Sequence, residues 1–268
     1  MSQTQADSPL PGPIDDGTWD EVGAGESGAR VFVRADGSQY AKQVPADQIA
    51  DLAAERDRAR WAADQGISGP QVVRWQAEET SACLVTSAVP GIPADQVGIE
   101  HLGRAWENIV DAVRELHQVP TTACPFDRGL NRMFSLARDV VARDAVHPEF
   151  LRPEQQTRAP GDLLEELAGQ LPQHLDQETS DLVVCHGDLC LPNIVLAPDT
   201  LEVVGFIDLG RLGCADRHAD ISLLLANAQD AWPEHAQSLA EVLTARYGHP
   251  IDPDRLRFHL FLDPLTWG

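Results

Sequence analysis

The stretch that decides the fold spans residues 183–196 and reads Val183-Val184-Cys185-His186-Gly187-Asp188-Leu189-Cys190-Leu191-Pro192-Asn193-Ile194-Val195-Leu196. Two apolar, strand-like runs flank a loop that holds a histidine, an aspartate and an asparagine. Polar side chains held between buried strands are costly unless they are paired or used. We therefore expect Asp188 to accept or orient a proton and Asn193 to offer an amide oxygen to a metal ion. The alternative is a loop whose polar residues only cap the strands.

A second aspartate follows the next apolar strand, in Val204-Gly205-Phe206-Ile207-Asp208-Leu209-Gly210. Carboxylate and amide oxygens are hard ligands that suit Mg²⁺. The sequence therefore predicts that Asn193 and Asp208 together hold Mg²⁺, although a strand-terminal aspartate can also cap a helix. Cys185, His186 and Cys190 are an alternative zinc set, but their spacing matches no familiar zinc pattern and no second ligand pair follows.

Phosphate-binding features lie nearer the N-terminus. The run Gly23-Ala24-Gly25-Glu26-Ser27-Gly28 is rich in glycine, which lets backbone amides approach phosphate oxygens closely. Lys42 is the only lysine in the chain, and Glu55 stands thirteen residues later in a helical pattern. A lysine held by a carboxylate can meet the phosphates of ATP. The alternatives are an ordinary turn, a solvated lysine and a surface carboxylate.

The chain divides into three regions that differ in composition and in predicted secondary structure. Residues 1–18 are polar and rich in proline, glycine and aspartate, and we expect a mobile tail without a signal peptide. Residues 19–89 read as strands, one helix and further strands, with a hairpin turn at Asp36-Gly37. Pro90-Gly91 breaks this pattern. Residues 90–268 are mainly helical, with short strands at 182–185, 194–196 and 203–207.

Helices in the last region are expected from apolar spacing and from helix start and stop signals. One apolar face begins at Ile99 and ends at Leu116. Further helices are predicted at about 129–144, 160–170, 217–229, 234–247 and 253–262. The prediction is an α+β, two-lobed chain.

Composition limits the partners. The 268 residues carry a formal net charge of −22, which repels nucleic acid and anionic membranes and would attract a cationic substrate. The alternative is that the acidic surface only keeps the protein soluble. No apolar run is long enough to cross a bilayer. The five cysteines are odd in number and no export signal precedes them, so we expect reduced thiols and a cytoplasmic location. We also expect a monomer.

Together these motifs resemble the protein-kinase-like fold, in which a Gly-rich loop, a strand lysine, a helix glutamate, His-x-Asp…Asn and Asp-x-Gly occur in this order. His186-Gly187-Asp188 and Asp208-Leu209-Gly210 depart from the protein-kinase forms, and no Ala-Pro-Glu follows. They resemble instead the aminoglycoside phosphotransferase family. The run Leu262-Asp263-Pro264-Leu265-Thr266-Trp267-Gly268 is most similar to that of the 3″-phosphotransferases, the streptomycin kinases.

The resemblance implies a small N-terminal lobe, a larger helical lobe, and ATP in the cleft between them. It implies the following nucleotide contacts: Gly25, Ser27, Gly28, Lys42, Glu55 and the linker around Ser87 and Val89. Asn193 and Asp208 would hold Mg²⁺, and Asp188 would be the catalytic residue that orients the hydroxyl of the acceptor. Asp263 and the terminal carboxylate of Gly268 would bind the cationic aminoglycoside, and capping a last turn is the alternative for Asp263.

Two other functions stay open from the residues alone. A kinase of the same fold for choline, homoserine or a sugar would share the catalytic parts and differ in the acceptor pocket. Choline would call for an aromatic cage, and only 6% of the residues are aromatic. A nucleotide-binding protein without catalysis is the second alternative, and the presence of all the expected catalytic residues argues against it.

Overall fold

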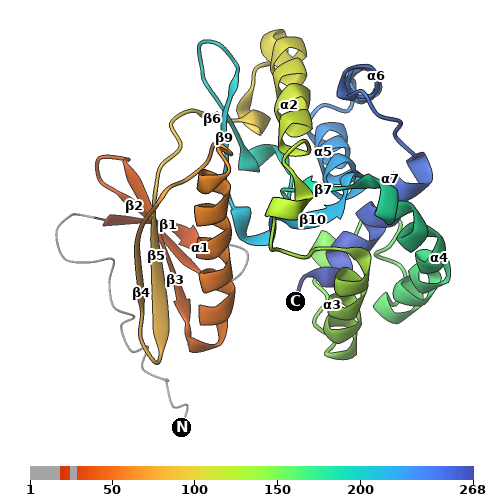
Figure 1. Cartoon of the computed structure of the whole chain (residues 1–268), viewed down its shortest axis with the longest axis horizontal. Helices are drawn as coiled ribbons and strands as arrows, with labels where there is room; N and C mark the ends of the chain where they lie inside the picture. The colour runs from red at the N-terminus through yellow and green to blue at the C-terminus, as the bar shows by residue number, and fades with distance from the viewer. Residues whose placement is uncertain (1–18, 25–28) are drawn as a thin grey trace. The chain divides into compact units, whose positions relative to one another are not determined.

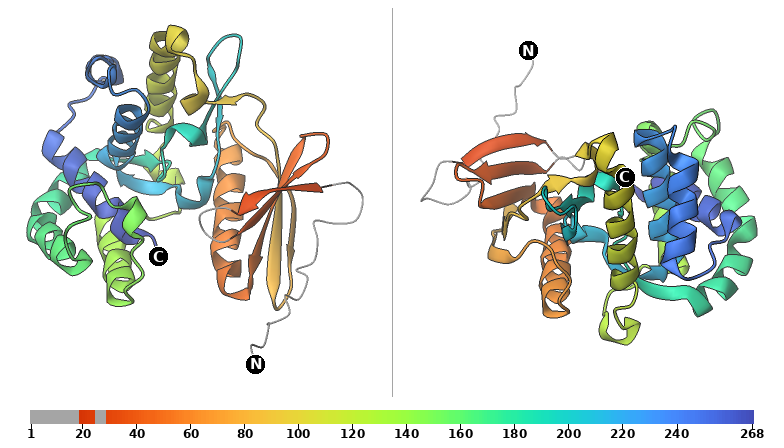
Figure 2. Two further views of the ribbon diagram at one scale, coloured as in Figure 1. Left: turned by 180° about the vertical axis from the view of Figure 1, so that it is seen from behind. Right: turned by 90° about the horizontal axis from the view of Figure 1, so that it is seen from above.

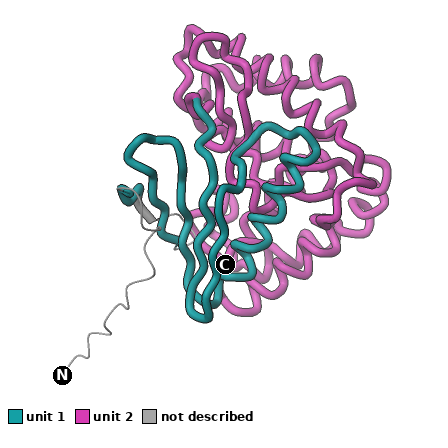
Figure 3. Tube along the Cα trace, turned by 60° about the vertical axis from the view of Figure 1, so that its left-hand side comes forward, with its two compact units in different colours: residues 1–90 teal, residues 91–268 magenta. Residues whose placement is uncertain are grey.

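The computed structural model describes residues 19–24 and 29–268 and divides into two compact units between Pro90 and Gly91 (Figures 1 and 3). The first unit holds a five-stranded sheet and the second unit is mainly helical. The predicted α+β class is therefore confirmed. No helix of the described residues is long and apolar enough to span a membrane.

The first unit is an antiparallel sheet with one long helix. Its strands are β1 (Trp19–Ala24), β2 (Arg30–Arg34), β3 (Gln39–Pro45), β4 (Val72–Ala77) and β5 (Ser81–Ser87), in the order β1-β2-β3-β5-β4. The predicted hairpin joins β2 to β3: Gly37 adopts a φ of +70°, and its N–H donates to the carbonyl of Arg34 at 2.7 Å. Helix α1 (Ile49–Asp64) packs on the sheet.

Successive apolar side chains of β5 point to alternate faces of the sheet, so both faces are apolar. Ala82 and Leu84 belong to one cluster, which also receives Leu52 of α1. Cys83 and Val85 point the other way into a second cluster with Phe32. Successive side chains of a strand point to opposite faces, so one central strand anchors both clusters.

The second unit has six α-helices among its residues, all of which are described: α2 (Leu102–Leu116), α3 (Leu130–Ala142), α4 (Pro160–Asp181), α5 (Arg217–Ala231), α6 (Ala236–Tyr247) and α7 (Pro253–Leu262). Helices α3, α4 and α7 lie side by side and share one apolar core (Figures 1 and 2). Phe134 and Phe258 stack in this core, with their ring centroids 6.1 Å apart. The core fixes the end of α7, from which the C-terminal segment starts.

Short strands place the functional loops of this unit. Strand β7 (Leu182–Cys185) pairs with β10 (Gly213–Asp216), and β8 (Ile194–Leu196) pairs with β6 (Ile92–Pro93) and β9 (Val203–Phe206). The loop with Asp188 joins β7 to β8, and Asp208 follows β9. The strands at 182–185 and 194–196 were predicted with these bounds, whereas β6 and β10 were not predicted.

Helix α4 corrects one predicted boundary. The sequence suggested an end near residue 170, but the helix continues through Pro172 to Asp181. A proline inside a helix removes one backbone hydrogen bond and crowds the preceding turn. Here Leu171 and Leu175, on either side of Pro172, both pack against the core of α3 and α7. This burial explains why the helix does not stop at the proline.

Candidate active site

The backbone of the loop after β7 is held by one buried carboxylate, that of Asp220. Asp220 of α5 is fully buried, and its two oxygens accept the backbone N–H groups of His186 at 2.6 Å and Gly187 at 2.8 Å. Burial alone would raise the pKa of Asp220, but its hydrogen bond with His117 and its backbone N–H donors hold the pKa below the usual range. The charged carboxylate therefore fixes the backbone that leads into Asp188.

His186 connects this loop to the strand that precedes Asp208. Its Nδ1 accepts the backbone N–H of Asp188 at 3.2 Å, and its Nε2 lies 2.9 Å from the carbonyl oxygen of Ile207. In the neutral imidazole, these partners would place the proton on Nε2. Both ring nitrogens of His186 therefore have hydrogen-bond partners within the protein. His186 connects two backbone segments of the site, and this geometry disfavours the alternative that it is a zinc ligand.

Asn193 binds Asp188 directly. Its amide nitrogen donates to the Asp188 carbonyl at 2.9 Å and to the carboxylate oxygen Oδ2 at 3.1 Å. The Cys190 thiol lies 3.7 Å from the other carboxylate oxygen. The predicted pair of Asp188 and Asn193 is thus brought together, and the amide oxygen of Asn193 is the end that suits a hard cation.

The residue before Asp208 ties it to the loop with Asp188 and Asn193. The Ile207 N–H donates to the Asn193 carbonyl at 2.9 Å, and the Ile207 carbonyl lies within hydrogen-bond distance of His186 Nε2. Asp208 itself has a φ of 56°, in the left-handed region that a non-glycine residue seldom adopts. Strained backbone of this kind clusters at functional sites. The backbone bond between Ile207 and Asn193 brings the two residues predicted to hold Mg²⁺ onto neighbouring segments, and their carboxylate and amide oxygens are ligand types that suit this ion.

Asp188 lies among other negative groups. Burial raises its pKa above the usual range, and the neighbouring carboxylates Asp263 and Asp208 raise it further. His186 and Arg211 act in the opposite direction. A carboxylate with a raised pKa is a better proton acceptor than an exposed one, which suits the role predicted for Asp188.

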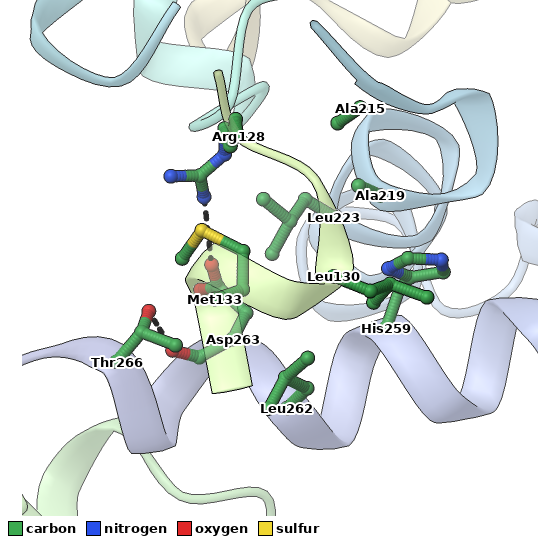
Figure 4. A pocket seen from close by; sticks show the side chains of 10 residues that line it. All are labelled: Arg128, Leu130, Met133, Ala215, Ala219, Leu223, His259, Leu262, Asp263 and Thr266. Carbon is green, nitrogen blue, oxygen red and sulfur yellow. Dashed lines mark hydrogen bonds and ion pairs between the residues drawn. The ribbon is translucent and has the colours of Figure 1, made fainter. Parts of the chain in front are cut away.

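The C-terminal segment places Asp263 beside Arg128, with its Oδ1 3.4 Å from the guanidinium (Figure 4). The same oxygen lies 3.6 Å from Arg211, and Oδ2 accepts the indole N–H of Trp267 at 3.0 Å. The guanidinium of Arg211 also stacks over the Trp267 ring at 4.0 Å. Only 16% of the Asp263 side chain is exposed. An acceptor cation would therefore share this carboxylate with two arginines of the chain.

Arg128 is one residue of this site that the sequence did not reveal. Its Nη2 donates to the Gly187 carbonyl at 2.6 Å, directly before Asp188, and the same nitrogen faces Asp263. Burial, followed by the nearby charge of Arg211, lowers its pKa to about 10, so it remains a cation at neutral pH. A lone arginine between a loop and a helix gives no sequence signal, because its partners are 59 and 135 residues away.

Gly187 has two structural reasons to be glycine. Its φ of +85° lies in the left-handed region. A Cβ at this position would collide with the carbonyl oxygen of Arg211 and stand 2.7 Å from Nε of Arg128. The central residue of the His-Gly-Asp motif is therefore enclosed by both arginines of the cluster.

Gly268 lies close to α3. Its carbonyl oxygen is 3.4 Å from the guanidinium of Arg143, and a Cβ here would stand 2.5 Å from the carbonyl of Ala145. Gly268 and Asp263 are both carried by the segment that follows α7.

In the first unit, the predicted lysine–glutamate pair is present. Lys42 Nζ lies 2.8 Å from the Glu55 carboxylate, and both side chains are largely shielded, with 27% and 19% exposed. Ser87 ends β5, where its hydroxyl accepts the N–H of Gln71 at 3.0 Å, and Val89 follows two residues later. Gly25, Ser27 and Gly28 lie outside the described residues.

Among the described histidine, cysteine, aspartate and glutamate side chains, three gather ligand atoms within 4.8 Å: His117, Cys185 and Asp220. Their atoms already satisfy one another and the backbone. His117 bonds Tyr247 at 2.6 Å and Asp220 at 3.1 Å, and Asp220 also binds the loop before Asp188. We interpret this cluster as the support of the loop after β7.

Comparison with known proteins agrees with this geometry. The model of the phosphotransferase enzyme family matches residues 18–259. A streptomycin 3″-kinase of Streptomyces griseus is 57% identical over 98% of this chain and all of that protein. An aminoglycoside 3′-phosphotransferase of Streptomyces fradiae is 40% identical over 91% of this chain and 94% of its own length.

A solved structure extends the similarity to three dimensions. An aminoglycoside phosphotransferase of the 3″ type from Streptomyces rimosus, in complex with ADP and streptomycin, superposes with a TM-score of 0.90 at 55% identity. The match covers 95% of this chain and 94% of that one.

Proposed function

This chain belongs to the phosphotransferase enzyme family, and from that premise we propose that it transfers the γ-phosphoryl group of ATP to the 3″-hydroxyl of streptomycin, a reaction that confers antibiotic resistance. The observation that carries the proposal is the group of Asp188, Asn193 and Asp208 in a chain 57% identical to a streptomycin 3″-kinase along nearly all its length. The similar structure that holds ADP and streptomycin supports both substrates.

Asp188 is the proposed catalytic residue. Its carboxylate accepts or orients the proton of the attacking hydroxyl, and the burial that raises its pKa favours this role. Phosphoryl transfer has a loose transition state, so positioning and charge neutralisation supply most of the rate. Asp220, His186 and Arg128 meet that need, because each holds the backbone on one side of Asp188.

Asn193 and Asp208 are the proposed ligands of Mg²⁺. When bound, Mg²⁺ would neutralise charge on the phosphates of ATP. The chain's own contribution is to hold the two ligand residues next to each other, through the hydrogen bond from Ile207 to Asn193.

Nucleotide contacts are proposed for the first unit, residues 19–89. Lys42, held by Glu55, would meet the α- and β-phosphates, and the salt bridge between them supports this role. The backbone around Ser87 and Val89 would bind the adenine edge. Backbone amides of the segment with Gly25, Ser27 and Gly28 would approach the phosphates.

Acceptor contacts are proposed for the second unit, residues 90–268, together with Asp188. Asp263 and the carboxylate of Gly268 would bind the guanidinium groups of streptomycin by charge-assisted hydrogen bonds. Arg128 links the two sites, since its Nη2 lies 2.6 Å from the Gly187 carbonyl, directly before Asp188, and 3.4 Å from Asp263, and this geometry supports the assignment. We also propose that the enzyme works as a cytoplasmic monomer without nucleic-acid or membrane partners.

A panel of acceptors tests the proposal. The enzyme is incubated with ATP and Mg²⁺ and with streptomycin, kanamycin, choline or homoserine, and product masses are measured. We expect phosphorylated streptomycin alone. Transfer to choline or homoserine instead would reject the acceptor but keep the kinase, and ATP binding without transfer to any acceptor would favour a non-catalytic protein.

A further inference from the structure

Two of the five cysteines lie on neighbouring segments of the second unit. Cys124 belongs to the connection between α2 and α3, and Cys214 belongs to β10. The backbones of these segments are paired: the Cys214 N–H donates to the Phe126 carbonyl at 2.8 Å, and the Arg128 N–H donates to the Cys214 carbonyl at 2.9 Å. Both thiols are free and half-buried.

Cys124 and Cys214 share two carbonyl groups as neighbours. The Thr121 carbonyl accepts the backbone N–H of Cys124 at 3.1 Å and lies 3.7 Å from the Cys214 sulfur. In the opposite sense, the Phe126 carbonyl accepts the backbone N–H of Cys214 at 2.8 Å and lies 3.7 Å from the Cys124 sulfur. Each thiol is therefore next to the acceptor of the other residue's N–H, so the two side chains face each other.

The raised pKa of the Cys214 thiol agrees with this arrangement. Burial, together with the adjacent Cys124 thiol, raises its pKa to about 12. A thiol responds in this way when a second sulfur is close enough to interact with it. Disulfide formation requires backbones that already approach each other, as the paired segments do.

We propose that Cys124 and Cys214 form a dithiol modification site that a low-molecular-weight disulfide converts into an intramolecular disulfide. The Cys124 thiolate attacks one sulfur of the reagent, which breaks the reagent's S–S bond and releases one thiol. Cys214 then loses its proton and attacks the Cys124 sulfur, which releases the second thiol. The two cysteines are oxidised by two electrons in total, and the reagent takes up those electrons and two protons.

The remaining three cysteines are not equivalent to this pair. Cys83 and Cys185 are buried, and the Cys185 thiol lies beside the carbonyl of Asp216 at 3.5 Å. Cys190 accepts a hydrogen bond from the amide of Asn193 at 3.0 Å and lies 3.7 Å from the Asp188 carboxylate, so its thiol already has partners within the proposed catalytic group.

The new bond would join the connection before α3 to β10, immediately beside the backbone hydrogen bond between Arg128 and Cys214. It would also close a long segment of the unfolded chain, between positions 124 and 214. Closing such a segment stabilises the folded state mainly by restricting the unfolded one. We therefore expect the oxidised protein to melt at a higher temperature.

The test uses the full chain and glutathione disulfide as the probe. We expect a loss of mass equal to two hydrogen atoms, a peptide that links Cys124 to Cys214, and reversal by dithiothreitol. The melting temperature should rise by several degrees. The variants Cys124→Ser and Cys214→Ser, with Cys124→Ala and Cys214→Ala as a second pair, should give no cross-link and no rise.

Two results would overturn the proposal. One is glutathione attached separately to Cys124 and Cys214 without a link between them, because that would mean that the sulfurs do not meet. The other is a cross-link that leaves the melting temperature unchanged or lowers it, because the bond would then form only by distorting the fold.

Discussion

Asp188 is held in an environment that opposes its charge. Burial and the carboxylates of Asp263 and Asp208 raise its pKa, which means that the folded state binds the proton more tightly than the unfolded state does. Such a group contributes stability below the unfolded pKa of about 3.9, and that stability is lost as the pH rises through the folded pKa. At neutral pH the ionised carboxylate therefore destabilises the fold.

Asp188→Asn should separate function from stability. We expect kcat to fall by about 100-fold or more, because a general base supplies at least that factor. The free energy of unfolding at pH 7 should rise, since a neutral amide replaces a disfavoured charge. The increase should disappear below about pH 3.9, where Asp188 of the wild type is protonated in both states.

Urea unfolding at several pH values measures this effect, and Asp199→Asn is the matched control because that side chain is exposed. An Asp188→Asn protein that keeps ordinary turnover would reject the assignment of the catalytic residue. One that is less stable than the wild type at pH 7 would reject the electrostatic account.

Arg128→Met should act on turnover through the Gly187 carbonyl. The apolar side chain keeps most of the volume but donates no hydrogen bond to the residue before Asp188. Misplacement of a catalytic group by about 1 Å can cost roughly 100-fold in rate, so we expect kcat to fall by about that factor. ADP affinity should change little, and Arg128→Lys should recover part of kcat.

Steady-state kinetics and ADP titration provide the measurement for Arg128. If Arg128→Lys were no better than Arg128→Met while both proteins were folded, the cation at this position would not orient the loop. A rise in the KM for streptomycin alone would assign Arg128 to acceptor binding instead.

At the scale of elements, helix α5 organises the loop after β7. Asp220 lies on the buried side of α5 and binds two backbone N–H groups of that loop as well as His117. Asp230 lies near the other end of the same helix and makes an exposed pair with Arg152 at 2.8 Å. The helix thus carries one aspartate that supports the site and one that does not.

Asp220→Asn should destabilise the protein by about 3 kcal/mol, because an amide offers one acceptor where two N–H groups need two. Asp230→Asn, the same change on the same helix, should cost less than about 1 kcal/mol. Chemical denaturation of both variants gives the comparison. Equal effects would mean that Asp220 is not the support that the geometry implies.

The sequence predicted those elements whose determining residues are adjacent in the chain. The strands on either side of Asp188 and the hairpin at Asp36-Gly37 follow from apolar runs and turn residues that are adjacent in the chain. Lys42 and Glu55 were paired from spacing and from the resemblance, and their salt bridge is present. In contrast, α4 passes Pro172 because of packing against α3 and α7, which sequence spacing does not show.

The parts of the site that were missed depend on distant partners. Strand β10 is four residues long and is defined by its pairing with β7, about thirty residues earlier in the chain. Arg128 gains its role from Gly187 and Asp263, and Asp220 gains its role from N–H groups 33 and 34 residues away. None of these residues stands in a motif whose spacing implies its contact.

At the scale of the whole molecule, charge links the chain to its proposed acceptor. A formal net charge of −22 raises the local concentration of a cation near the surface. This long-range attraction is screened by salt, with a Debye length of about 8 Å at physiological ionic strength. The contacts at Asp188 are buried and are screened much less.

Raising the ionic strength should therefore increase the KM for streptomycin while kcat changes little. Initial rates at several potassium chloride concentrations measure this, and the same series at saturating streptomycin isolates kcat. A kcat that falls with salt at constant KM would place the charge effect in the chemical step and contradict the attraction of substrate by the surface.

The most direct test of the whole account is phosphorylation of streptomycin by the wild type and by Asp188→Asn side by side, with the product followed by mass and the phosphate located by ³¹P NMR. We expect the wild type to place one phosphate on the 3″-oxygen, and the variant to bind ADP equally well but form almost no product. Phosphate on another position, or a variant as active as the wild type, would contradict the account.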